Sequence, residues 1–156
     1  MLRIRTRIQS GLITLVILSG FLFSHHAHAI EALKFRDEYS TTLKFQIDHF
    51  LQQEQRSDAS QYVIATVDLN NDGVSEHILK RKSCNTPVST CTFIIIAEKG
   101  DRILLLSKIS AKNLMVDGKV TYGVKNLLAF NDDMNDYEYD IYMWSPKEKL
   151  YIMDGN

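Results

Sequence analysis

The chain is poor in the residues that usually interrupt regular structure or build chemical sites. Its 156 residues include only two prolines, two cysteines and one tryptophan. Two thiols alone do not complete a tetrahedral site, so the cysteines do not indicate bound zinc. The sequence also lacks a G-x-S-x-G motif, an H-E-x-x-H motif and a phosphate-binding glycine loop. We therefore expect no enzymatic activity.

The sequence also lacks a strong charge of one sign and a histidine placed to act in catalysis together with an acidic residue. The formal net charge is −1, which gives no general attraction to nucleic acid, and no nucleic-acid partner is expected. His77 directly follows Glu76, and on a strand neighbouring side chains point to opposite faces. These two residues are therefore a poor catalytic pair.

No apolar run is long enough to cross a bilayer. The longest, from Gly11 to Phe23, is shorter than the about 20 residues that a membrane-spanning helix needs. Three arginines precede it, and Ala27-His28-Ala29 follows with an A-x-A cleavage pattern. Residues 1–29 are therefore predicted to be a signal peptide, with an uncleaved membrane anchor as the alternative. No cysteine lies near the cleavage point, so lipid attachment is not expected.

Cleavage at this point would leave residues 30–156 as a single exported domain. This length suits one domain with its own core. The removed segment holds three arginines and no acidic residue, so the formal charge falls to −4. The expected location is the periplasm, with release from the cell as the alternative. Membrane contact is expected only through the uncleaved signal peptide.

Residues 31–55 show the periodicity of one amphipathic helix. Apolar side chains recur every three or four positions, and no proline or glycine interrupts the segment. The expected apolar face consists of Phe35, Tyr39, Leu43, Ile47, Phe50 and Leu51. We expect this face to pack on a sheet, and a partner-binding helix is the alternative.

Residues 61–153 are predicted to be rich in strands. Segments of β-branched, aromatic or alternating residues are separated by short polar turns. Asp117-Gly118 in particular predicts a tight hairpin turn. The expected fold class is α+β, in which an N-terminal amphipathic helix packs on a mainly antiparallel β-meander of about eight strands.

One loop combines residue types and spacing that suit a bound ion. Side-chain oxygens recur at every second position from residue 68 to residue 72, and Gly73 follows at once. Glycine lets the backbone curl round an ion, and calcium takes about six to eight oxygen ligands. The predicted calcium ligands are Asp68, Asn70, Asp72, the backbone carbonyl of Val74, and Glu76. The alternative is a tight turn that binds no ion.

The segments on either side distinguish this loop from an EF-hand. Both read as strands, and the twelfth position, where an EF-hand has glutamate, is Leu79. The loop resembles the D-x-N-x-D-G-x-x-[DE] loops of FG-GAP and integrin-α-propeller-like repeats, which also occur in small exported bacterial proteins. The resemblance implies a calcium loop followed by a cysteine pair and a C-terminal aromatic strand, matched here by Cys84, Cys91 and residues 144–151. Only one copy of the loop is present, so a full propeller is excluded.

The two cysteines, Cys84 and Cys91, both lie in the predicted exported part. An even number of cysteines in an oxidising compartment favours a disulfide. The residues between them are turn-like. We therefore predict a structural disulfide that closes a hairpin.

Residues 131–136 form a second acidic segment, which lacks a glycine that would fold it round an ion. We expect a solvated loop there, with a second calcium site as the alternative. Aromatic residues follow it, and such residues are favoured at interfaces. The candidate recognition residues are Asp132, Asp133, Asp136, Tyr137, Tyr139, Tyr142 and Trp144. Core packing of the aromatic side chains is the alternative.

The function expected from these features is that of an exported, periplasmic binding or interaction module stabilised by calcium. Its expected partner is an envelope or secreted protein. The alternative is a periplasmic inhibitor or immunity protein directed against a cell-wall hydrolase of the lysozyme or amidase kind. In that case the acidic segment would enter a basic active site.

Overall fold

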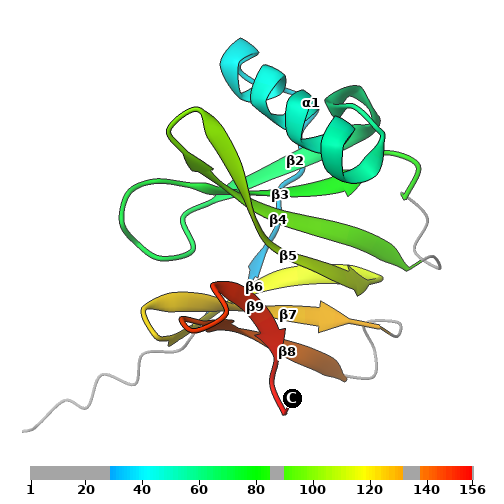
Figure 1. The fold of residues 1–156 in the computed structure, drawn as a ribbon. Helices are drawn as coiled ribbons and strands as arrows, with labels where there is room; N and C mark the ends of the chain where they lie inside the picture. Colours follow the sequence, from blue (N-terminus) through cyan, green and yellow to red (C-terminus); the bar gives the residue numbers. More distant parts are fainter. Residues whose placement is uncertain (1–28, 85–89, 132–137, 156) are drawn as a thin grey trace, which may run out of the picture.

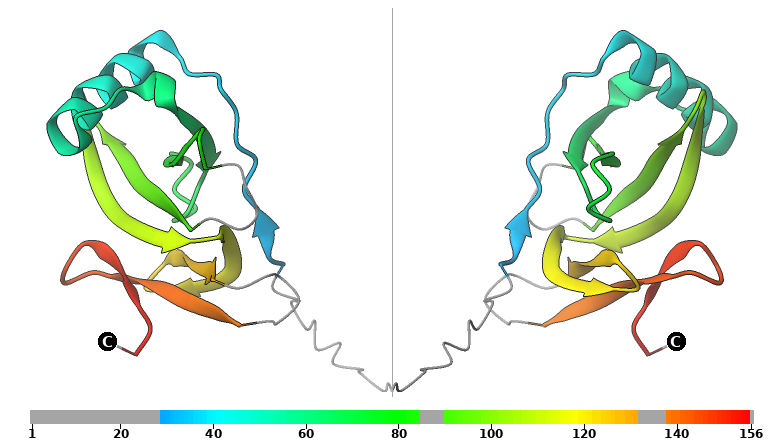
Figure 2. Two further views of the ribbon diagram at one scale, coloured as in Figure 1. Left: turned by 90° about the vertical axis from the view of Figure 1, so that its right-hand side faces the viewer. Right: turned by 90° about the vertical axis from the view of Figure 1, so that its left-hand side faces the viewer.

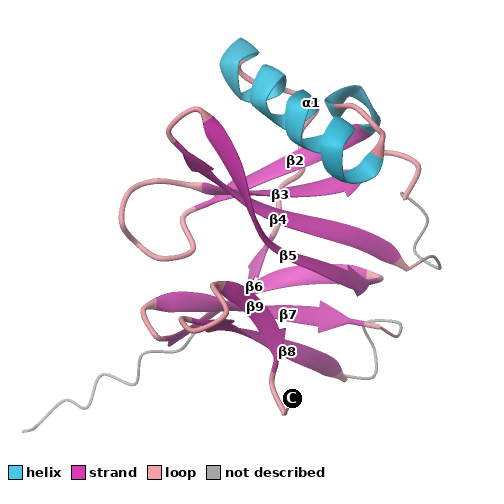
Figure 3. Ribbon diagram, in the orientation of Figure 1, coloured by secondary structure: helices cyan, strands magenta, loops and turns pink. Residues whose placement is uncertain are grey.

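The computed structural model describes residues 29–84, 90–131 and 138–155. Within these residues the chain is mostly β-structure, with nine strands and one α-helix (Figure 3). In chain order the elements are β1 (Glu31–Ala32), α1 (Thr41–Gln55), a short 3-10 helix η1 (Ala59–Gln61), β2 (Tyr62–Val67), β3 (Glu76–Arg81), β4 (Cys91–Lys99), β5 (Arg102–Ala111), β6 (Asn113–Thr121), β7 (Val124–Phe130), β8 (Tyr139–Ser145) and β9 (Leu150–Met153).

The strands form two antiparallel sheets, one above the other in Figure 1. The upper sheet has the strand order β2-β3-β4-β5, and the lower sheet has the order β1-β6-β7-β8-β9. The side views in Figure 2 show α1 on the outer side of the upper sheet, away from the lower one. The molecule is therefore a β-sandwich with a helix as a third layer on one side.

The strands β5 and β6 carry the chain from the upper sheet to the lower sheet. Only Lys112 separates them, and its backbone N–H donates to the carbonyl of Phe130 in β7 at 2.8 Å. On its way from β1 to α1 the chain crosses between the sheets a second time, since β1 pairs with β6 but the backbone of Arg36 pairs with Ile64 in β2. The two sheets are therefore tied together at both crossings.

Two apolar clusters hold the layers together. The first lies between the sheets and includes Ile78, Phe93, Ile95, Leu114 and Leu127. The second lies between α1 and the upper sheet and includes Ile47, Leu51, Tyr62, Leu79 and Ile96. Because neighbouring strand residues point to opposite faces, the long apolar run in β4 can serve both clusters at once. Ile95 faces the lower sheet, while Ile94 and Ile96 face the helix.

The predicted N-terminal helix over residues 31–55 is wrong in its first ten residues. The helix begins after Ser40, whose side chain accepts a hydrogen bond from the backbone N–H of Leu43 at 3.2 Å and so caps the first turn. The segment before it is not helical, because Glu31 and Ala32 pair with β6 and Arg36 pairs with β2. Phe35 accordingly packs in the cluster between the sheets, against Phe93, and not on the helix face.

The predicted single meander of an α+β fold is also wrong. The strands divide between two packed sheets, and a two-residue strand, β1, precedes the helix. Asp117-Gly118 lies inside β6, at an irregularity in its pairing with β7, and makes no hairpin. The turn between these strands is at Tyr122-Gly123, where φ is 52° and 82°, and two residues with positive φ are what a type I′ hairpin turn requires.

Other expectations from the sequence are confirmed. The chain is rich in β-strands, and the β2–β3 pair flanks the acidic loop. Cys84 and Cys91 form a disulfide. Such a bond is compatible with an exported protein.

Candidate functional site

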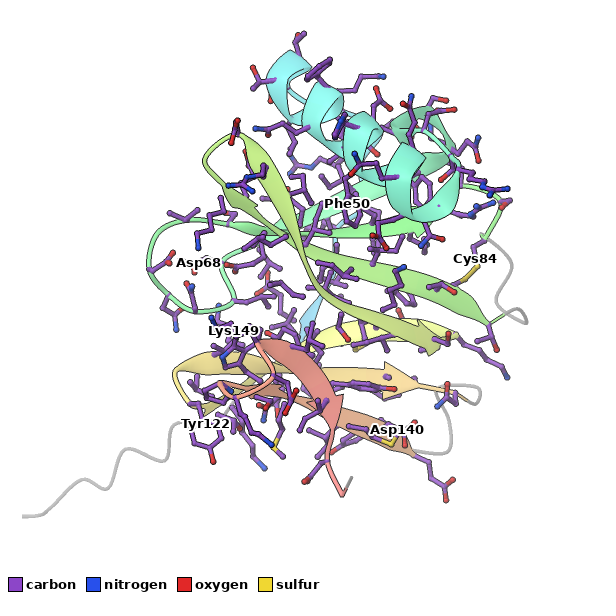
Figure 4. The ribbon with its side chains drawn as sticks, in the orientation of Figure 1. Phe50, Asp68, Cys84, Tyr122, Asp140 and Lys149 are labelled. Atoms are coloured by element: carbon purple, nitrogen blue, oxygen red, sulfur yellow. A yellow bond between two sulfur atoms is a disulfide. The ribbon has the colours of Figure 1, made fainter. Side chains whose placement is uncertain are left out.

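The candidate metal site is the loop between β2 and β3, which begins at Asp68. Figure 4 places Asp68 and Cys84 at opposite ends of the upper sheet. Two loop residues have positive φ, namely Asn71 at 56° and Gly73 at 85°. These two conformations reverse the chain within a few residues, as the presence of glycine at position 73 predicted.

Side-chain oxygens of the loop accept hydrogen bonds from its own backbone. The N–H of Gly73 donates to Asp68 Oδ2 at 2.9 Å, and the N–H of Asp72 donates to Asn70 Oδ1 at 3.0 Å. The N–H of Val74 donates to Asp72 Oδ1 at 2.7 Å. These bonds turn the side-chain oxygens toward the inside of the loop. The same arrangement also occurs in tight turns that bind no ion.

The second carboxylate oxygen of Asp68 is the feature that a plain turn does not explain. Asp68 Oδ1 is buried and has no hydrogen-bond partner among the described residues. A buried carboxylate oxygen without a partner is costly, because it has lost its water and gained nothing in exchange. A cation bound at Oδ1 would compensate for this loss, and the donor set around it consists of hard oxygens, which calcium prefers.

Glu76 closes the loop from the inside of the sandwich. The residue is only 7% exposed, and its Oε2 accepts a hydrogen bond from the backbone N–H of Leu69 at 2.8 Å. Burial raises the pKa of the Glu76 carboxyl, the bond from Leu69 opposes this shift, and the charges of Asp72 and Asp68 raise the pKa further. Three acidic groups thus interact unfavourably within one loop.

The three acidic side chains are not assembled into a ready-made cluster. No group of three or more acidic, histidine or cysteine side chains that could hold a metal occurs in residues 29–84, 90–131 and 138–155. Glu76 is engaged with Leu69, so the loop offers chiefly Asp68, Asp72, the amide oxygen of Asn70 and backbone carbonyls such as that of Val74. This set fits a weak calcium site that water molecules complete.

Lys125, in β7, anchors the loop to the other sheet. Its ammonium donates to the backbone carbonyl of Asp68 at 2.9 Å, and its backbone N–H donates to the carbonyl of Leu69 at 2.7 Å. The hydroxyl of Tyr151, in β9, donates to the carbonyl of Lys125 at 2.9 Å. Burial raises the pKa of Tyr151, as does the nearby charge of Glu76, so this hydroxyl stays a donor. No local sequence pattern marks Lys125, because this contact joins residues that are far apart in the chain.

A small cavity of about 170 Å³ lies on the inner side of the loop. Asn70 and Glu76 line it from the loop, and Trp144 and Tyr151 line it from the lower sheet. The two aromatic rings meet edge to face, with their centroids 5.8 Å apart. The two ends of the loop, at Leu69 and Glu76, are thus buried at the aromatic end of the core, while residues 71–74 are exposed.

His77 belongs to a hydrogen-bonded chain that the sequence did not suggest. Its Nδ1 lies 3.1 Å from Thr66 Oγ1, and its Nε2 lies 2.9 Å from Glu98 Oε1. The three residues come from adjacent strands of the upper sheet. His77 is 5% exposed, and both nitrogens of its buried ring have partners on side chains that reach the surface. Glu76, its neighbour in the chain, bonds elsewhere and accepts from the backbone N–H of Leu69.

The candidate recognition residues are only partly within the described chain. Asp132, Asp133, Asp136 and Tyr137 lie outside it. Tyr142 and Trp144 pack against the cluster between the sheets, whereas Tyr139 is 43% exposed and contacts the ring of Phe130. The aromatic residues of β8 are therefore divided between its two faces. A joint recognition surface made by these residues stays a prediction.

Across the described residues, no helix combines the length and apolar character needed to cross a membrane. Comparison of the chain with protein-family models, with curated proteins and with solved structures gave no match.

Proposed function

We propose that the chain is an exported interaction module whose β2–β3 loop binds one calcium ion. The observation that carries this proposal is Asp68 Oδ1, a buried carboxylate oxygen without a hydrogen-bond partner in the described part of the chain. The residues that would hold the ion are Asp68, Asn70, Asp72, the carbonyl of Val74 and, if it turns from Leu69, Glu76. The signal peptide expected over residues 1–29 would deliver the domain to the periplasm.

The role proposed for calcium is structural. A divalent cation would neutralise the acidic groups of the loop, where burial raises the pKa of Glu76 and the charges of Asp72 and Asp68 add to this shift. The loop already bonds to the lower sheet through Lys125, so fixing the loop also fixes the contact between the sheets. Calcium would therefore stabilise the packing of the two sheets against each other, and it would take no part in a reaction.

Thermal unfolding in calcium and in a chelator tests the metal part of the proposal. With a dissociation constant on the order of 0.1–1 mM, several millimolar calcium should stabilise the fold by about 1–2 kcal/mol. That corresponds to an increase of a few degrees in melting temperature. No increase in the wild-type protein would contradict a calcium site.

A matched pair of variants locates the effect. Asp68→Asn keeps the size of the side chain but removes its charge, and should abolish most of the calcium-dependent increase. Asp101→Asn makes the same change in the β4–β5 turn, where the side chain is 96% exposed, and should leave the increase intact. Equal responses of the two variants would place the calcium elsewhere.

The interaction part requires a partner. Residues 30–156 would be used to capture envelope proteins in calcium and in chelator, followed by direct binding measurements with the purified partner. A partner bound only in calcium would support a calcium-dependent module. If the captured partner were a cell-wall hydrolase that loses its activity on binding, the inhibitor alternative would replace the general one.

A further inference from the structure

Among the described residues, the outer edge of β2 has one position whose backbone N–H and C=O have no hydrogen-bond partner. In the described chain, the pairing at this edge is the bridge between Arg36 and Ile64, whose two hydrogen bonds measure 2.8 and 2.9 Å. In an antiparallel ladder, alternate residues direct their N–H and C=O groups to the same side. Tyr62 and Thr66 therefore also direct their backbone groups outward, in line with Ile64.

Two of these three outward positions are occupied. The carbonyl of Tyr62 accepts a hydrogen bond from the hydroxyl of Tyr39 at 2.9 Å, and its N–H donates to Ala59. Ile64 is paired with Arg36. At Thr66 no backbone hydrogen bond on this side occurs within the described residues, and the residue is exposed. A strand edge with an unused donor and acceptor is a template for another chain.

A groove lies beside this position because the N-terminal segment leaves β2 here. If the pairing of Arg36 with Ile64 continued, Lys34 would lie opposite Thr66, but the segment instead runs to β6, where Ala32 pairs with Met115. The separation leaves a cavity of about 520 Å³, which Lys34, Arg36, Ile64 and Thr66 line. Its volume lies within the range of about 300–1,000 Å³ that is usual for ligand clefts.

The walls of the groove indicate what kind of ligand fits. Charged residues of both signs line it, with Glu31 and Glu38 beside Lys34 and Arg36. Such walls suit the polar backbone of a peptide and its charged side chains, and they oppose a lipid or other apolar molecule. The sequence of β2, Tyr-Val-Ile-Ala-Thr-Val, contains no proline or charge, which are the common devices that prevent strand addition.

We propose that the edge of β2 at Thr66 binds an extended peptide segment of a partner protein by strand addition. The peptide enters between β2 and residues 33–36, pairs its backbone with the N–H and C=O of Thr66, and meets the charged side chains of the groove. Main-chain hydrogen bonds then supply affinity, and the groove supplies selectivity. This inference rests on the proposed interaction role and names its surface, but it does not depend on calcium.

The test uses a random peptide library displayed on phage, selected against the folded domain. A selected peptide is then synthesised, and its affinity is measured for the wild type and for two variants. Thr66→Pro removes the outward N–H and disturbs no backbone hydrogen bond to β3, because the N–H and C=O of Thr66 point away from that strand. Thr66→Val keeps the N–H and removes only the hydroxyl that contacts His77. We expect binding to fall roughly tenfold or more in the proline variant and by less than about threefold in the valine variant.

Hydrogen exchange on the wild-type protein supplies a second measurement that needs no variant. The amide of Thr66 should exchange at least tenfold more slowly when the peptide is bound, while the amide of Tyr122, in the distant β6–β7 turn, should not change. Failure to select any peptide, equal affinity of the two variants, or unprotected Thr66 would each overturn the proposal. Because the melting temperature in calcium is measured separately, such a failure would leave the calcium site intact.

Discussion

The ammonium of Lys125 lies 2.9 Å from the backbone carbonyl oxygen of Asp68, so a cation from one sheet already sits beside the acidic loop of the other. This contact joins β7 to the first residue of the proposed calcium loop. Together with the bond from the N–H of Lys125 to Leu69, it fixes where the loop lies on the sandwich.

Replacing Lys125 with methionine should weaken this attachment. The variant keeps the aliphatic stem but loses a charged hydrogen-bond donor, which costs about 1–3 kcal/mol of unfolding free energy. Urea unfolding of the wild type and of Lys125→Met measures the difference. Lys119→Met removes the same charge from an exposed side chain of β6, and should change stability by less than about 0.5 kcal/mol. Equal effects would show that Lys125 acts only through net charge.

Removing the disulfide should destabilise the domain moderately. Cys84 and Cys91 are separated by seven positions, and loop-closure entropy for so small a ring gives roughly 2–3 kcal/mol. We expect the double variant Cys84→Ser and Cys91→Ser to show this loss in urea unfolding. A reductant should lower the stability of the wild type but not that of the variant. A stability of the double variant equal to that of the oxidised wild type would contradict the prediction.

The carboxyl of Asp48 should make stability depend on pH. Burial alone would raise its pKa, but hydrogen bonds from the ammonium of Lys44 and the backbone N–H of Ala59, both at 2.6 Å, hold the pKa below the ordinary value of 3.8. A lowered pKa means that the ionised group stabilises the fold above about pH 3.8 and that this contribution is lost as the pH falls through the lowered value.

Asp48→Asn gives a direct check of this dependence. At pH 7 the variant should be less stable than the wild type by about 1 kcal/mol, and the difference should shrink steadily as the pH is lowered below 4. The free energy of unfolding, measured at several pH values for both proteins, reports this difference. A gap that stays constant down to pH 2 would show that ionisation of Asp48 contributes nothing.

Substitutions on α1 should distinguish the face that packs on the sheet from the face that is exposed to solvent. Leu51 is fully buried, so Leu51→Ala should cost about 2–5 kcal/mol. Phe45 lies on the same helix but is 74% exposed, and Phe45→Ala should change stability by less than about 0.5 kcal/mol. Thermal or urea unfolding distinguishes the two variants. A large loss in Phe45→Ala would instead indicate that this side of the helix is covered.

The sequence predicted best those features that depend on short spacing. The end of α1, the strands on either side of the acidic loop and the disulfide all follow from residues close together in the chain. The start of the helix was missed because Phe35 and Tyr39 fit the helical period although residues 31–40 are not helical. Ser40 followed by Thr41 was the available signal, since serine is a favoured helix cap.

The features that sequence reasoning missed depend on contacts between distant residues. Asp117-Gly118 has the composition of a hairpin turn, but the pairing of β6 with β7 continues past it to Tyr122-Gly123. The bond between Lys125 and Asp68 spans 57 positions. The burial of Glu76 beneath the loop likewise depends on residues of the lower sheet, so no local sequence pattern predicts it.

The direct passage of β5 into β6 through Lys112 has a mechanical consequence. The two sheets are joined by one continuous stretch of chain, and strands of both contribute to the apolar cluster between them. Loss of order in one layer would pull on the strand that continues into the other and would uncover the apolar face of that other layer. The domain should therefore come apart in a single cooperative step, with no half-melted state in which one layer persists alone.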